Sequence, residues 1–254
     1  EWGLDIKSKL LLKKNMTFTL VNQFVQQQHV PVFHKVRLEN FRLNEMNPQL
    51  RLLSYARLKT ENGTRFFRET ELTLSFQQGT EGRNSQKNNS TTLRKERDQV
   101  RTAGITLDVL SAISSTWTAN TGAEIYLDQV FSKREDIDLT TGSVSGKRGL
   151  YPDRSRYSNY SIYTLHHFNH GKWSADAGLR LNWFSIQISD TSLGHVSIHP
   201  SAVVGNAALL YALDRKQSVY VSVSSGYRAP NVDDLGTLGI VDFRYELPAA
   251  DLKP

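Results

Sequence analysis

The 254-residue sequence contains no cysteine, so neither a disulfide framework nor a cysteine-based metal site can form. It also lacks any run of about 18 apolar residues, which excludes transmembrane helices. There is no starting methionine and no signal peptide, and the first residues already read as the middle of a strand. We therefore expect the sequence to be a fragment of a longer protein.

The distribution of charge along the sequence argues against a nucleic-acid partner. The net charge is +6 and the isoelectric point is about 9.4, values that could suggest nucleic acid or an anionic membrane surface. The basic residues are dispersed, however, and concentrate in the segments expected to be loops. We interpret them as solvated loop surface and expect no nucleic-acid partner. The mean hydropathy of −0.44 does not exclude a membrane location, since the lumen-facing residues of membrane β-barrels are polar.

The segment from Trp173 to Trp183 alternates strictly between apolar and polar residues. Successive side chains of a strand point to opposite faces, so one face would be wholly apolar and would begin and end with tryptophan. Ten residue steps of about 3.3 Å, tilted by about 40°, rise roughly 25 Å, the height of the apolar band of a membrane barrel. A strand of a soluble β-sandwich would show the same alternation and remains the alternative.

Similar segments follow one another along the whole chain. About ten of them are visible, at roughly 2–11, 16–25, 49–58, 66–77, 103–113, 116–131, 159–168, 173–183, 201–212 and 217–227. Short turns near 13, 62, 114, 170 and 215 alternate with long connections near 26–48, 78–102, 132–158, 185–200 and 228–254. In an up-and-down sheet, the short turns then lie at one end and the long loops at the other. This segregation is typical of outer-membrane barrels and favours an all-β, antiparallel membrane β-barrel over a Greek-key sandwich.

Two motifs near the C-terminus carry a family resemblance. Tyr227-Arg228-Ala229-Pro230 is followed by Asp251-Leu252-Lys253-Pro254, and the segment resembles the TonB-dependent outer-membrane receptors. Their barrels carry an aromatic-Arg-Ala-Pro motif and, later, a motif similar to Asn-Pro-Asp-Leu-Lys-Pro-Glu. Here Leu247-Pro248-Ala249-Ala250 stands where Asn-Pro is usual. Residues 47–51 and 171–183 also resemble barrel segments of this family.

The resemblance implies a barrel of about 22 strands in a Gram-negative outer membrane, with its lumen closed by an N-terminal plug. This chain would be roughly the middle of that barrel, without the plug or the last strands. The implied function is binding of a scarce nutrient, such as an iron chelate, haem or cobalamin, and its import with energy from the TonB system acting on the plug. The alternatives are a passive porin, an adhesion barrel or a soluble β-sandwich that binds a protein or sugar.

Six residues are candidates for ligand contact. Tyr151, Arg154 and Arg156 lie in a loop that interleaves aromatic and arginine side chains, a composition suited to an anionic or planar ligand. Tyr227, Arg228 and Asn231 lie in or beside the Arg-Ala-Pro motif. A solvated loop with incidental arginines would have the same composition. For Asp233 and Asp234 we favour turn or cap chemistry over cation binding.

No other chemistry is expected. The histidines at 166, 167 and 170 and those at 195 and 199 lie in strand or loop positions without metal-ligand spacing, so we expect neither metal nor cofactor. No histidine follows Tyr227, which argues against one mode of haem binding that the resemblance would suggest. The sequence has no Gly-x-Ser-x-Gly motif, phosphate-binding glycine loop or paired-carboxylate signature, and we therefore expect no enzyme and no catalytic residue.

Overall fold

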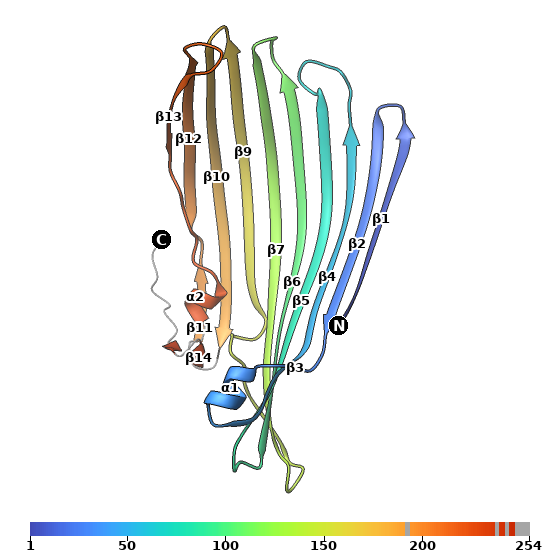
Figure 1. Cartoon of the computed structure of the whole chain (residues 1–254), viewed down its shortest axis with the longest axis vertical. Coiled ribbons are helices and arrows are strands. Elements are labelled where there is room, and N and C mark those ends of the chain that lie inside the picture. The colour runs from blue at the N-terminus through green and yellow to red at the C-terminus, as the bar shows by residue number, and fades with distance from the viewer. Residues whose placement is uncertain (191–193, 237–238, 242–243, 247–254) are drawn as a thin grey trace.

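The computed structural model describes residues 1–190, 194–236, 239–241 and 244–246, and most of them belong to one 13-stranded sheet (Figure 1). Ten long strands cross this sheet in chain order, with every neighbouring pair antiparallel: β1 (Trp2–Lys13), β2 (Met16–Gln27), β4 (Phe41–Thr60), β5 (Glu69–Lys87), β6 (Thr92–Ala112), β7 (Trp117–Asp138), β9 (Ser155–His170), β10 (Trp173–Asp190), β12 (Ser201–Ala212) and β13 (Ser218–Ser224). The expected antiparallel up-and-down sheet of about ten strands is confirmed.

The remaining elements are short. Three small strands pair with long ones: β3 (Val30–Pro31) with β4, β8 (Val144–Arg148) with β7 and β11 (Gly194–Ile198) with β10. A separate two-stranded sheet is formed by β14 (Gly239–Val241) and β15 (Arg244–Glu246). The helices are α1 (Phe33–Leu38) and α2 (Val232–Gly236). Neither helix is long or apolar enough to cross a membrane.

The connections between strands differ at the two ends of the sheet. Four of the five predicted short turns are confirmed, because β1–β2, β6–β7, β9–β10 and β12–β13 are joined near residues 14, 114, 171 and 215. The connection predicted near 62 joins β4 and β5 as expected, but it spans eight residues, 61–68. These turns gather at the upper end in Figure 1, whereas α1 and the tips of the β5–β6 and β7–β8 hairpins lie toward the lower end. We call these the turn end and the loop end.

The long loops expected at the loop end are wrong in their bounds. Most of 78–102 is strand, because β5 continues to Lys87 and β6 begins at Thr92. The pairing runs unbroken from Gln78↔Arg101 to Ser85↔Arg94. The strands continue although their apolar alternation has ended, since backbone ladder bonds need no apolar side chain. A polar composition was therefore a poor signal for a loop here.

The other expected loops also contain regular structure. Segment 26–48 holds β3, α1 and the start of β4; segment 132–158 holds the ends of β7 and β9 with β8 between them. Segment 185–200 holds the end of β10 and β11, with 191–193 outside the described residues. Segment 228–254 holds α2, β14 and β15, and residues 237–238, 242–243 and 247–254, including the second motif, lie outside the described part.

The two faces of the sheet differ in chemistry. We call the face that bears Trp173, Leu179 and Trp183 the outer face, and these three side chains are about half exposed (49, 49 and 45%). The opposite, inner face is polar: Arg180 Nη2 donates to Glu124 Oε2 at 2.5 Å and to Ser161 Oγ at 2.8 Å. One apolar face and one hydrogen-bonded polar face match a barrel wall between lipid and a polar lumen. The sandwich alternative is wrong, because no second sheet packs against the apolar face in the described part.

The small apolar core lies on the inner face near the loop end. Val130 of β7 and Ile186 and Ile188 of β10 are buried beneath Val232 and Leu235 of α2. Helix α2, which follows the Arg-Ala-Pro motif, therefore packs against the inner face of the sheet.

Candidate ligand-binding hollow

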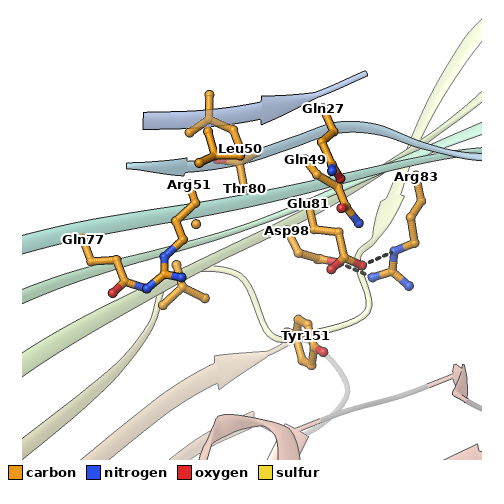
Figure 2. A pocket seen from close by; sticks show the side chains of 13 residues that line it. Gln27, Gln49, Leu50, Arg51, Gln77, Thr80, Glu81, Arg83, Asp98 and Tyr151 are labelled. Atoms are coloured by element: carbon orange, nitrogen blue, oxygen red, sulfur yellow. Dashed lines mark hydrogen bonds and ion pairs between the residues drawn. The ribbon is translucent and has the colours of Figure 1, made fainter. Parts of the chain in front are cut away.

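A hollow of about 520 Å³ opens on the inner face near the loop end (Figure 2). Two rows of in-register residues form its floor. One row is Val25, Arg51, Gly79 and Val100, and the next is Gln27, Gln49, Glu81 and Asp98. Because odd and even positions of a strand face opposite sides, four neighbouring strands contribute these side chains to one surface. Tyr151, which follows β8, stands across the hollow from this floor in Figure 2.

Ser132 of β7 attaches residues 149–153, which we call the Tyr151 segment, to the inner face of the sheet. Its hydroxyl accepts a hydrogen bond from the Tyr151 backbone N at 3.1 Å and donates one to Asp98 Oδ1 at 2.5 Å. Its backbone N donates to Asp153 Oδ1 at 3.0 Å. A Cβ atom on Gly149 would lie 2.1 Å from Ser132 Oγ, so only glycine allows the chain to approach this closely. The segment is thus fixed over the inner face.

The charged groups of the hollow are arranged around Asp98. Arg83 Nη2 donates to Asp98 Oδ2 at 2.5 Å, and Arg83 Nε lies 3.3 Å from Glu81 Oε1. Both contacts are drawn in Figure 2. Arg51 has no hydrogen bond or ion pair with any other described side chain. With two arginines and two carboxylates, the lining is balanced in charge, and Arg51 is the cation available to a bound group.

The phenol of Tyr151 has a raised pKa. Burial, together with the nearby carboxylates of Asp233 and Asp98, raises the pKa of Tyr151 to about 12. A raised pKa keeps this phenol protonated throughout the neutral range, so it can donate a hydrogen bond into the hollow and present its ring for stacking.

Arg148 closes the loop end behind Tyr151. Its guanidinium bonds to Asp190 Oδ2 at 2.8 Å, to the carbonyls of Gly149 and Leu150 at 3.0 Å each, and to the carbonyl of Gly236 at 2.7 Å. One side chain therefore holds together the end of β10, the Tyr151 segment and the end of α2.

Comparison with known families assigns this architecture. A family model described as "TonB dependent receptor-like, beta-barrel" matches residues 24–254. The chain belongs to the TonB-dependent receptors. The matched part is the β-barrel of this family, as the resemblance of the Arg-Ala-Pro segment implied. No curated protein sequence matches the chain.

Solved structures share the fold of this TonB-dependent receptor barrel at low identity. The structure titled "Copper transporter OprC" is 12% identical with a TM-score of 0.75, and the match covers 92% of this chain and 38% of that chain. The ferric citrate transporter FecA, in its unliganded form, is 15% identical with a TM-score of 0.62, over 87% of this chain and 35% of that one. This chain thus spans little more than a third of either neighbour.

The receptor's structure separates the three candidates that follow β8. Tyr151 lines the hollow. The side chain of Arg154 is 80% exposed and its nearest acid is Asp153, 3.7 Å away. Arg156 faces the other side of the sheet, because its register partners Gln129 and Gln187 continue the rows of Leu127 and Trp183 on the outer face. The structure therefore does not bring Arg154 and Arg156 together with Tyr151.

The candidates of the Arg-Ala-Pro segment have structural contacts of their own. The Tyr227 ring stacks on Phe184 of the inner face, with centroids 5.9 Å apart. Asn231 Oδ1 accepts the Asp234 backbone N–H at 2.9 Å, and Asp234 returns the bond to the Asn231 N–H at 3.0 Å. Arg228 Nη2 reaches Asp234 Oδ1 at 2.7 Å. This reciprocal pair caps α2, which confirms the cap interpretation of Asp234.

Sequence reasoning missed Arg51, Asp98 and Ser132 as parts of the site. Asp98 lies within the segment predicted to be a loop, and Ser132 lies at the start of another. A strand alternation continued through residues 78–101 would have placed Asp98 on the same face as Glu81. Among the described residues, no group of three or more His, Asp or Glu side chains is placed to hold a metal ion.

Ser132→Ala is expected to loosen the Tyr151 segment. The change leaves the buried Asp98 without one of its donors and the Tyr151 N–H without its acceptor, at a cost of about 1–3 kcal/mol. Hydrogen exchange of residues 149–153 should accelerate, while exchange in the β9–β10 hairpin stays the same. Unchanged exchange at 149–153 would show that Ser132 does not hold this segment.

Proposed function

We propose that the protein containing this chain is a receptor of the Gram-negative outer membrane. It binds a scarce nutrient, such as an iron chelate, haem or cobalamin, and imports it with energy supplied through TonB. The single observation that carries the proposal is the family match over 24–254. The apolar outer face and the polar inner face with its hollow support it, because a receptor barrel needs lipid contact outside and ligand contact inside.

The hollow supplies the chemistry for capture. Tyr151 offers a protonated phenol and a ring, Arg51 offers a cation, and Gln27, Gln49 and Gln77 offer amide donors and acceptors. Such a lining favours a polar ligand that accepts several hydrogen bonds and carries a planar or anionic group. In this proposal Tyr227, Arg228 and Asn231 contribute at the rim, where they also hold α2 in position.

Uptake measured with and without TonB tests the function. The protein containing this chain is expressed in a Gram-negative host, and cells receive labelled ferric citrate, copper(II), haem or cobalamin. We expect one compound to accumulate only in the host with intact TonB. Equal accumulation without TonB would support the passive porin instead. Failure of the protein to fractionate with the outer membrane would contradict the proposed location.

Tyr151→Ala is expected to weaken binding of the transported compound about tenfold. Loss of ring stacking and of one hydrogen bond removes on the order of 1.5 kcal/mol. Tyr151→Phe keeps the ring and should lose only the hydrogen-bond share, which separates the two contributions. Binding to intact cells is the measurement, with surface expression matched. An alanine variant that binds as tightly as the wild type would exclude Tyr151 from the site.

A further inference from the structure

A second hollow, of about 710 Å³, lies on the outer face toward the loop end. The strands β5, β6 and β7 form its floor, and the bulge between Met46 and Gln49 of β4 overhangs it. The overhang is possible because Gly82 has no side chain, and a Cβ there would lie 2.2 Å from the Asn47 carbonyl oxygen. The hollow is thus shaped by the local backbone.

The lining of this second hollow is basic, and at one position two positive charges face each other without an acid between them. Arg97 of β6 and Lys133 of β7 stand directly opposite one another in the antiparallel register, and both are exposed. Like charges in this position repel each other and destabilise the pair of strands. Neither side chain forms an ion pair or hydrogen bond with any residue of the described part. An anion bound between them would remove this repulsion.

The other charged residues of the lining do not neutralise Arg97 and Lys133. Lys95 faces Glu135 in register, and these two lining residues balance each other. Arg101 lies on the same outer face, with its guanidinium 5.1 Å from the centroid of the Phe131 ring. Glu96 also borders the hollow, but it faces Arg134 in register, at the even positions that point to the inner face. Arg97, Arg101 and Lys133 are therefore three positive charges on the outer face, which we call the outer basic cluster.

The position of the cluster selects the kind of anion. Toward the turn end, the same outer-face rows carry Ile105 and Leu107 on β6 and Ile125 and Leu127 on β7, all of them exposed. Toward the loop end the register continues with Arg101 opposite Gln129 and Gln99 opposite Phe131, and Arg97 opposite Lys133 comes next. A basic group at the edge of an apolar band lies where the headgroups of a surrounding bilayer begin.

We propose that the outer basic cluster binds the phosphate of an anionic lipid headgroup, whose acyl chains lie along the apolar outer face. The phosphate lies between Arg97 and Lys133, and Arg101 contacts it from the membrane side. The interaction rests on the proposed membrane location of the barrel, but it is independent of nutrient binding on the inner face. A headgroup bound in this way would fix the height of the loop end relative to the bilayer.

Lipid titration of the purified, detergent-solubilised protein tests the proposal by native mass spectrometry. The probes are short-chain phosphatidic acid, short-chain phosphatidylcholine and inorganic phosphate. We expect phosphatidic acid to bind more tightly than phosphatidylcholine. In the double variant Arg97→Gln/Lys133→Gln, its affinity should fall about 30-fold, since each cation near an anionic headgroup contributes about fivefold.

Two further variants keep the result interpretable. Lys7→Gln/Lys9→Gln removes two exposed charges from the inner face of β1 and should leave lipid affinity unchanged. Arg97→Lys/Lys133→Arg keeps both charges and should retain binding. Equal affinity of the wild type and the glutamine variant would overturn the proposal. So would equal binding of the zwitterionic lipid, or competition by inorganic phosphate at the lipid's own concentration, which would assign the cluster to a soluble anion. Loss of nutrient uptake with lipid binding intact would contradict only the proposed function.

Discussion

Leu179→Arg is expected to destabilise the folded barrel by about 2–4 kcal/mol, the cost of an arginine facing the middle of a bilayer. Leu179 lies midway along the alternating part of β10, on the outer face, and its side chain is 49% exposed in the isolated sheet. A cation there must be removed from water and has no acid beside it on the outer face. The midpoint of urea unfolding in lipid vesicles should fall accordingly.

Asn206→Arg is the matched control. Asn206 pairs with Gly178, and Leu179 pairs with Gly205, so the two substitutions lie at the same depth on opposite faces. An arginine at 206 projects into the polar lumen, and its effect should stay below about 1 kcal/mol. If both variants lose the same stability, the assignment of the outer face to lipid is wrong.

Arg148→Met is expected to release the loop end from the wall at a cost of about 3 kcal/mol. The Arg148 side chain is 19% exposed and that of its partner Asp190 only 5%. Removing the cation leaves a buried carboxylate without this ion pair and three carbonyls without this donor. Methionine keeps the aliphatic stem, so the loss reflects charge and hydrogen bonds. Hydrogen exchange should accelerate at both 149–154 and 232–236.

Arg134→Met serves as the comparison for this variant. Arg134 pairs with Asp136, two residues away on the same strand. This ion pair does not connect separate segments of the chain, so its loss should release none. We expect a cost of about 1 kcal/mol or less and no change of exchange at α2. Equal protection of α2 in the wild type and in Arg148→Met would contradict the role of Arg148.

The sequence predicted the structure well wherever apolar and polar side chains alternate along the chain. Alternation predicted the membrane-facing part of β10 and which residues face outward or inward, and turn residues predicted four of the five short turns. The bounds of β12 at Ser201 and Ala212 were also predicted. In these segments lipid on one side and polar groups on the other impose a period of two residues.

The ends of the strands toward the loop end could not be predicted in this way. Beyond Gln78 and Arg101 both faces of the β5–β6 hairpin are mostly polar, with Leu93 and Val100 as exceptions, so alternation disappears although the backbone ladder continues. Cross-strand pairs such as Arg83 with Asp98 stabilise this part instead. Such pairs become visible only once the register is known.

The candidate site was predicted in part for the same reason. Tyr151 followed from a local composition of aromatic and arginine residues. Arg148 was missed because its contacts reach Asp190 and Gly236, which are 42 and 88 residues away in sequence. Arg156 was grouped with Tyr151 by proximity in sequence, although it begins a strand and faces the outer side.

The chain order of the strands bears on how such a wall can fold. Each long strand pairs with the long strands next to it in chain order, and β1 and β13, at the two edges of the described sheet, each pair with one. Each pairing therefore closes only a short stretch of chain, and the entropy lost per step stays small. The sheet can grow by adding one hairpin at a time to an existing edge, and low contact order of this kind favours fast folding. Slow steps are then expected at α2 and Arg148, where segments distant in sequence must meet.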